Sequence, residues 1–214
     1  NEIGAFAEAD AVVISTKLFS TLPPVELLSG YAEMLKHGLL SSAEDYTDLL
    51  KFDILDADLE RLLPMLEKSV KVKQRIVTED PHERGIRRTL NLGHTAGHAF
   101  ESLAIHKGHP IPHGHAVAYG MLVEMILSNM LEGYPSGELY RYAAYLKEHG
   151  YGKPEFSCDD YPALVAYMHH DKKNDIPETI NFTLLSSPGV PLIDHTAAEK
   201  EILAALDIFR DMME

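Results

Sequence analysis

An apolar segment over residues His113–Leu131 constrains the fold of this 214-residue chain most strongly. A surface helix keeps its apolar residues on one stripe, whereas here they lie on nearly every side. The segment also carries the small residues Ala116, Ala118 and Gly120. We therefore predict that it forms a buried central helix against which the rest of the domain packs.

Helical periodicity continues through most of the chain after the turn-forming stretch Thr21-Leu22-Pro23-Pro24. One of these helices begins with Pro64, since proline is tolerated at the first helical position. The predicted helices, besides the central one, cover Val25–Leu40, Ser42–Leu50, Pro64–Glu79, His94–Ala104, Ser136–Glu148, Tyr161–His169 and Ala197–Met213.

Strand signals are few. Ala11–Ser15 is a short apolar run with three β-branched residues, and Ile180–Leu185 can form a short strand or an extended segment. We interpret Ala11–Ser15 as the last strand of a domain that begins upstream, also because the first residue is Asn and not Met. The expected fold is mainly α: residues 1–20 are the remnant of an α/β domain, and residues 21–214 form one helical domain.

Composition excludes several classes of partner. The formal net charge of −14 argues against a nucleic-acid or anionic-membrane surface, although a few Lys and Arg can still gather in one cleft. No run reaches the ~18 apolar residues of a membrane span, and no signal-peptide pattern is present. Cys158 is the single cysteine, so no disulfide framework is possible and a cytoplasmic protein is expected.

Histidines cluster around the start of two predicted helices. His94 and His98 are four residues apart, and Glu101 follows three residues later, so all three share one helix face. His113 begins the next apolar segment. This composition is typical of a divalent-metal site of the His/Glu kind with room for a substrate ligand. The spacing of His94 and His98 alone fits a purely structural role about as well as a role in metal binding.

Charged residues also fall on helix faces that should be apolar. Lys73 follows Leu66 and Val70 and precedes Val77 in what reads as the apolar stripe of its helix, and Glu33 and Lys36 share one face. Buried ionisable groups are costly unless paired or metal-bound, which suggests a shared polar cavity. Taken singly, each signal has a structural explanation: Lys73 can extend to solvent, and Arg84, Arg87 and Arg88 can form a solvated patch.

The order of these motifs resembles 3-dehydroquinate synthase. The motifs are Ala32-Glu33-Met34-Leu35-Lys36-His37-Gly38, Lys73, Glu83-Arg84-Gly85-Ile86-Arg87, Leu90-Asn91-Leu92-Gly93-His94-Thr95-Ala96-Gly97-His98, His113-Gly114 and Asp171-Lys172-Lys173. The resemblance covers nearly the whole chain but only the C-terminal, metal-binding half of that family. It implies that residues 1–20 end an N-terminal dinucleotide-binding domain.

The resemblance implies roles for individual residues. Glu33, His94 and His113 match the zinc ligands of the family. Lys36, Lys73, Arg87 and Asn91 match residues that hold the substrate's carboxylate and hydroxyl groups. His98 matches a histidine near the phosphate and the mobile proton, Glu83 an acidic residue that lines the site, and either Lys172 or Lys173 a lysine near the phosphate. The catalytic residues expected from this match are Lys36, Glu83 and His98.

The implied reaction converts 3-deoxy-D-arabino-heptulosonate 7-phosphate to 3-dehydroquinate and phosphate in the shikimate pathway. It uses NAD for a transient oxidation, followed by β-elimination, reduction and an intramolecular aldol closure, with zinc or cobalt as Lewis acid. The chain has no glycine-rich dinucleotide fingerprint, so we expect it to be inactive by itself and to lack NAD contacts of its own. The full-length protein is expected to be a homodimer.

The sequence departs from the family pattern at two places, and two other functions remain as alternatives to this interpretation. His115 stands where the family usually carries Glu, and Ile176-Pro177 stands where glycine is expected. The first alternative is a related enzyme, either another sugar-phosphate cyclase or a metal-dependent polyol dehydrogenase. The second is a non-catalytic helical module for binding or dimerisation, in which Glu33→Ala and His94→Ala would leave the metal content unchanged.

Overall fold

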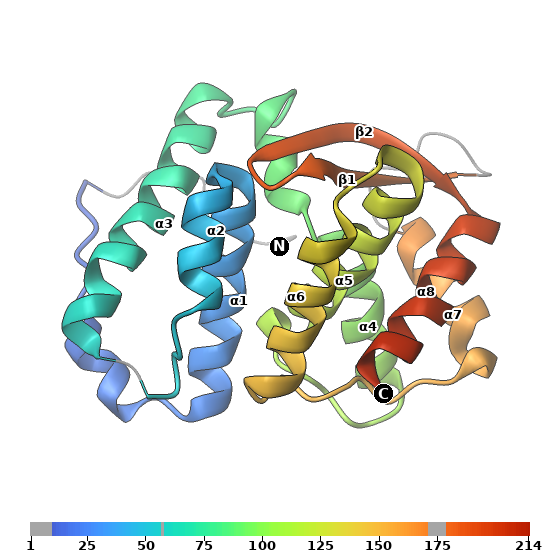
Figure 1. Cartoon of the computed structure of the whole chain (residues 1–214), viewed down its shortest axis with the longest axis horizontal. Helices are drawn as coiled ribbons and strands as arrows, with labels where there is room; N and C mark the ends of the chain where they lie inside the picture. Colours follow the sequence, from blue (N-terminus) through green and yellow to red (C-terminus); the bar gives the residue numbers. More distant parts are fainter. Residues whose placement is uncertain (1–9, 57, 171–178) are drawn as a thin grey trace.

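The computed structural model describes residues 10–56, 58–170 and 179–214, and the fold is mainly helical as predicted. Figure 1 shows α1, α2 and α3 side by side at one end of the molecule, α4 to α8 at the other, and the β1–β2 hairpin across one side. No helix in this described part is long and apolar enough to cross a membrane. The helices are α1 (Pro24–Ser41), α2 (Ala43–Leu50), α3 (Leu59–Glu79), α4 (His94–His106), α5 (His113–Glu132), α6 (Ser136–Glu148), α7 (Tyr161–His170) and α8 (Glu199–Met213).

Helix α5 is the buried centre of the fold, which confirms the prediction from its apolar pattern. Every residue from Gly114 to Ser128 is buried. It packs against α1, α4, α6, α8 and β1. A helix with neighbours on all sides needs apolar residues on all sides, and this explains why the segment has no polar stripe.

Two glycines of α5 fix how closely its neighbours approach. A Cβ at Gly114 would lie 1.9 Å from the carbonyl oxygen of Ser29 on α1, and one at Gly120 would lie 2.0 Å from the carbonyl oxygen of Gly93 before α4. Neither backbone oxygen can move aside without moving its helix. Glycine at these two positions therefore holds α1, α4 and α5 together at short range.

Helix α3 differs from the prediction in its start and in its buried face. It begins at Leu59 after the N-cap Asp58, whose carboxylate accepts backbone N–H groups of the first turn, so Pro64 lies inside the helix and not at its start. The buried residues are Leu62, Ser69 and Ile76, spaced seven apart, whereas Lys73 and Val70 are exposed. The predicted stripe through Lys73 is therefore wrong, because the helix is rotated to place Ser69 inward.

The strands also differ from the prediction. Ala11–Ser15 is exposed and forms no strand, so its β-branched residues did not indicate one here. The segment at Ile180–Leu185 is a strand, and it belongs to the antiparallel hairpin of β1 (Thr179–Ser187) and β2 (Val190–Ala198). Three short 3₁₀ helices, η1 (Thr16–Thr21), η2 (Ile86–Asn91) and η3 (Cys158–Asp160), complete the described elements.

Candidate metal centre

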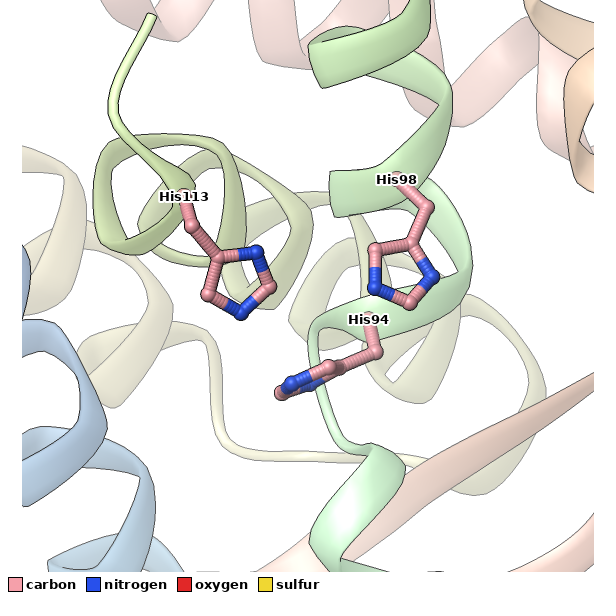
Figure 2. Close-up of side chains that lie close together, drawn as sticks. All are labelled: His94, His98 and His113. Carbon is pink, nitrogen blue, oxygen red and sulfur yellow. The ribbon is translucent and has the colours of Figure 1, made fainter. Parts of the chain in front are cut away.

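Three histidines from two helices converge at one point, as Figure 2 shows. His94 and His98 lie one turn apart on α4, and His113 is the first residue of α5. The ring centroid of His94 lies 5.3 Å from that of His98 and 5.4 Å from that of His113. One nitrogen from each ring lies within 4.8 Å of the others, which is close enough for a shared metal ion.

The carboxylate of Glu33 on α1 lies beside the same histidines. Its Oε1 is 3.7 Å from Nε2 of His94 and 3.9 Å from Nε2 of His113. Its Oε2 accepts a hydrogen bond of 2.7 Å from the ammonium of Lys36, one turn further along α1. The structure thus brings together Glu33, His94 and His113 as one set of three donors, with His98 as an alternative third donor next to them.

Hydrogen bonds on the far side of each ring determine which nitrogen faces Glu33. His94 Nδ1 lies 3.2 Å from the carbonyl oxygen of Leu92, which can only accept, so Nδ1 carries the proton and Nε2 keeps its lone pair. His113 Nδ1 lies 3.3 Å from Oε2 of Glu101. A backbone carbonyl or a carboxylate behind a histidine is the usual arrangement for metal ligands, because it fixes the ring orientation and the tautomer.

Burial and local charges favour the protonation states that a metal ion requires. Burial, together with the positive charge of Lys36, lowers the pKa of His94 to about 3, so this imidazole is neutral at pH 7. Burial by itself would raise the pKa of Glu33, but the charge and hydrogen bond of Lys36 outweigh it and the pKa lies below its ordinary value. A neutral imidazole and an ionised carboxylate are the ligand forms of these residues.

A buried carboxylate that the sequence analysis missed holds the start of α4. Glu124, in the middle of α5, accepts a hydrogen bond of 2.6 Å from the backbone N–H of Gly93 and one of 3.4 Å from that of Ala96. A negative charge is favourable at a helix N-terminus. Glu124 therefore positions His94 through the backbone, and the available signal was its place as an acidic residue inside an otherwise apolar helix.

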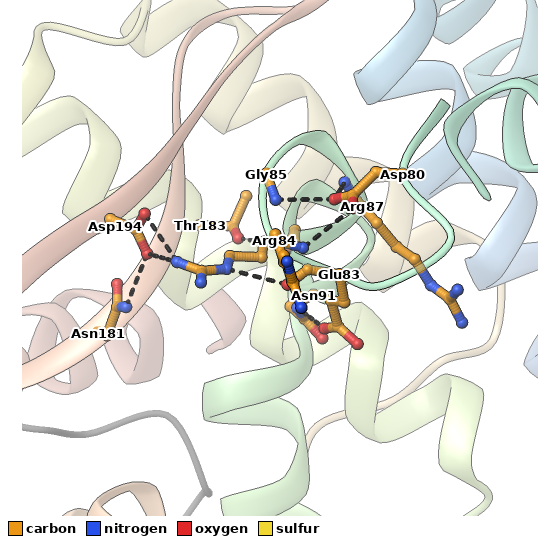
Figure 3. Close-up of polar contacts among 10 residues, drawn as sticks. Asp80, Glu83, Arg84, Gly85, Arg87, Asn91, Asn181, Thr183 and Asp194 are labelled. Carbon is orange, nitrogen blue, oxygen red and sulfur yellow. Dashed lines mark hydrogen bonds and ion pairs between the residues drawn. The ribbon is translucent and has the colours of Figure 1, made fainter. Parts of the chain in front are cut away.

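The loop between α3 and α4 brings together two other predicted site residues, Glu83 and Asn91 (Figure 3). Asn91 donates from Nδ2 to Oε1 of Glu83 at 3.1 Å. The carboxylate of Asp80 accepts hydrogen bonds from the backbone N–H groups of Gly85 and Arg87, which folds the loop back on itself. This loop holds Glu83 and Asn91 in the stretch of chain that leads directly into His94.

The basic residues predicted to bind substrate do not all share one environment. The guanidinium of Arg87 donates to the carbonyl oxygen of Pro81 in its own loop. Lys73 is exposed on α3, but its charge reaches Lys36 beside the metal cluster, since it contributes to lowering the pKa of Lys36. Lys172 and Lys173 lie outside the described residues. Arg88, treated above as part of a solvated patch, forms an ion pair with Asp194 of β2 at 2.7 Å.

The fold defines a class of protein. It matches 2-epi-5-epi-valiolone synthase from Streptomyces hygroscopicus, solved with NAD+ and Zn2+ bound, with a TM-score of 0.79 and 21% identity over 99% of this chain and 58% of that one. It also matches 2-deoxy-scyllo-inosose synthase, solved with carbaglucose-6-phosphate, NAD+ and Co2+, with a TM-score of 0.72 and 22% identity over 92% of this chain and 55% of that one. The chain therefore has the fold of part of these two synthases, which defines its class by fold.

Within this class, the chain belongs to the 3-dehydroquinate synthase family. The family model described as "3-dehydroquinate synthase C-terminal" matches residues 30–174. The 3-dehydroquinate synthase of Parabacteroides distasonis is 46% identical over 99% of this chain and 59% of that protein, and that of Staphylococcus carnosus is 37% identical over 93% and 54%. The chain thus spans little more than half the length of these curated relatives. The predicted family and its C-terminal part are confirmed.

Proposed function

We propose that this chain is the metal- and substrate-binding part of a 3-dehydroquinate synthase, which converts 3-deoxy-D-arabino-heptulosonate 7-phosphate to 3-dehydroquinate and phosphate. The family membership supports the reaction. The observation that carries the proposal is the convergence of one carboxylate oxygen of Glu33 with the Nε2 atoms of His94 and His113, next to the buried ammonium of Lys36.

Glu33, His94 and His113 would hold a zinc ion in this proposal. Their carboxylate and imidazole donors suit zinc, and three protein ligands leave positions for substrate oxygens. Zinc supplies Lewis-acid chemistry by polarising a hydroxyl or carbonyl oxygen. We favour Glu33 over His98 as the third ligand because one of its carboxylate oxygens faces the Nε2 atoms of both His94 and His113.

The other predicted residues bind the substrate and move its protons. Lys36 lies at the cluster itself and would hold an oxygen of the substrate by charge and hydrogen bonding. Asn91, held by Glu83, would orient a hydroxyl group, and Arg87 and Lys73 would bind the anionic ends together with Lys172 or Lys173. His98 would transfer the proton of the elimination step, since imidazole both accepts and donates protons near neutral pH. NAD would be bound by parts of the protein outside this chain.

Metal analysis of the purified chain tests the ligand set. We expect about one zinc per chain by mass spectrometry, and a melting temperature that falls when a chelator removes the metal. Glu33→Gln, His94→Ala and His113→Ala should each lose the metal, whereas His98→Ala should keep it. His106→Ala, an exposed histidine at the end of α4, serves as the matched control. Full occupancy in Glu33→Gln together with loss in His98→Ala would assign the third ligand to His98.

Activity tests need a protein of the full length of the relatives, because this chain spans little more than half of that length. Phosphate release from 3-deoxy-D-arabino-heptulosonate 7-phosphate, with NAD present, is the expected activity, and the 214-residue chain alone should show none. Other sugar-phosphate substrates belong in the same assay, because the two solved structures with this fold are cyclases of different names. Turnover of one of those substrates only would place the protein among the other cyclases. Unchanged metal content in all ligand variants would favour a non-catalytic module.

A further inference from the structure

Arg88, in η2 just before α4, lies at the centre of a hydrogen-bond network around the predicted site residues Glu83 and Asn91. Its backbone carbonyl oxygen accepts from Nδ2 of Asn91 at 3.0 Å and from Oγ1 of Thr183 at 3.0 Å. Its guanidinium donates from Nε to the backbone oxygen of Glu83 at 3.3 Å, and from Nη1 to the carboxylate oxygens of Asp194 at 2.7 and 2.9 Å. One residue thus connects the loop before α4 with both strands of the hairpin.

The two residues that the Arg88 side chain contacts share an unusual backbone conformation. Glu83 has a φ of 54° and Asp194 a φ of 60°, and in the part of the chain that the structure describes they are the only residues other than glycine with a positive φ. A residue with a Cβ is unfavourable in this region and stays there only where its surroundings enforce it. Arg88 donates to the carbonyl oxygen of one and to the carboxylate of the other, so it is placed to hold both.

The same network fixes the side-chain amide of Asn91. Its Nδ2 donates to Oε1 of Glu83 at 3.1 Å and to the carbonyl oxygen of Arg88 at 3.0 Å. A carboxylate and a carbonyl group only accept, so the nitrogen of the amide faces them and Oδ1 points away from them. An amide held through both of its hydrogens has a fixed orientation before any substrate arrives.

Stability alone does not explain why Arg88 and Asp194 are paired. Their side chains are 40% and 49% exposed, and ion pairs this exposed contribute little to stability. Figure 3 shows Asp194 and Asn181 on the hairpin, beside the loop that carries Glu83 and Asn91. Asn181 donates from Nδ2 to Asp194 at 3.2 Å, so the carboxylate that receives Arg88 is itself held in place. The pair therefore affects where the loop lies more than it affects the free energy of unfolding.

We propose that Arg88 is a positioning residue, which holds the backbone of Glu83 against the hairpin residue Asp194 and so orients the amide of Asn91 for the substrate. The inference rests on the function proposed above, in which Asn91 orients a hydroxyl group of the substrate. Arg88 does not itself bind the substrate, because its guanidinium is engaged with a carboxylate and a carbonyl oxygen. A small displacement of an orienting group lowers the rate strongly, since the reacting atoms must be aligned.

Steady-state phosphate release by a protein of the full length of the relatives tests this role. Arg88→Ala and Asp194→Ala should each lower kcat about tenfold, with KM changed by less than about threefold and the zinc content unchanged. The double variant should lose no more than either single variant, because both substitutions remove the same contact. Arg84→Ala is the matched control, since Arg84 is an exposed arginine of the same loop whose side chain makes none of these contacts, and it should keep the original rates.

Two kinetic results would overturn the proposal. A higher KM in Arg88→Ala, with unchanged kinetics in Asp194→Ala, would make Arg88 a direct ligand of the anionic substrate. Unchanged kinetics in both variants would leave Arg88 with a structural role only.

A second measurement needs no turnover, and so it separates failure of this inference from failure of the proposed function. In NMR spectra of the 214-residue chain, the side-chain amide of Asn91 is assigned by its absence in Asn91→Asp. Its protons should exchange with water about tenfold faster in Arg88→Ala and Asp194→Ala than in the unsubstituted chain or in Arg84→Ala. Equal exchange rates in all four would contradict the positioning role. The expected rates in a protein that releases no phosphate would support the positioning role and refute the proposed function.

Discussion

Replacing Gly120 with alanine should push α4 and α5 apart. A Cβ at this position would lie 2.0 Å from the carbonyl oxygen of Gly93 and 2.5 Å from the backbone nitrogen of Gly97. Real Cβ contacts stay beyond 3.0 Å, so the helices must separate by at least about 1 Å at this level. Both opposing atoms belong to the backbone, and no side-chain rotation can relieve the clash.

The expected cost follows from two opposing effects. Overpacking a well-packed core costs about 1–3 kcal/mol, and the rigid backbone partners put this clash at the upper end. Alanine in place of glycine inside a helix stabilises the folded protein by about 1 kcal/mol. We therefore expect Gly120→Ala to lower the free energy of unfolding by about 2 kcal/mol. Because α4 carries His94 and α5 carries His113, its zinc affinity should also fall, by about tenfold or more.

Gly137→Ala is the matched control for this substitution. Gly137 lies in α6, and an added Cβ would meet nothing within 4 Å. The same chemical change should there stabilise the protein by about 0.5–1 kcal/mol and leave zinc binding unchanged. Urea denaturation and competition with a chelating dye measure the two quantities. If both substitutions shift stability in the same direction, the close approach of α4 and α5 does not determine the packing as argued.

Three further predictions concern buried and surface charges. Burial, together with the charge of Lys36, lowers the pKa of His37 from 6.5 to about 4, so the unfolded chain binds this proton more readily. Stability should fall as the pH drops from about 6.5 toward 4, by at most ~1.4 kcal/mol per pH unit, and His37→Gln should flatten this slope in thermal denaturation. Glu124→Gln should cost about 2 kcal/mol in urea denaturation, because it removes a charged acceptor from the N-terminus of α4; a loss under ~0.5 kcal/mol would contradict that role. Arg88→Ala should cost less than ~1 kcal/mol, decreasing with salt, because Arg88 and Asp194 are both substantially exposed; a cost independent of salt would contradict this.

Local periodicity made most of the fold predictable. The eight helices match the predicted segments within a few residues at most ends, because the spacing of apolar residues is set within each helix. The spacing of His94 and His98 likewise placed both rings on one face. The approach of Glu33 and His113 to that face is a tertiary contact. The histidine composition suggested His113 as a further ligand, but only the resemblance to a known family assigned Glu33 to the same set.

The errors share a physical cause, since each depends on contacts distant in sequence. The helical pattern of α3 fits two rotations, and packing against α1 selected the one that buries Ser69 and exposes Lys73. Strand β2 contains Pro191 and Asp194, which disfavour a strand locally, yet pairing with β1 forms it. The role of Glu124 needs a backbone partner 31 residues away. None of these partners is visible in a local window of sequence.

The position of Glu33 between Lys36 and the histidines explains how an acidic chain can attract an anion. One oxygen of Glu33 bonds to Lys36 and the other faces His94 and His113, so a cation near the histidines need not displace the lysine. The Lys36 side chain is only 4% exposed, and an ammonium this buried needs its carboxylate partner. The charges of Glu33 and Lys36 cancel and His94 is neutral, so a divalent cation would add two positive charges, of which the carboxylate of Glu101 beside His113 offsets one, with Lys73 nearby. A chain with a net charge of −14 would thus present a locally positive site to an anionic sugar phosphate.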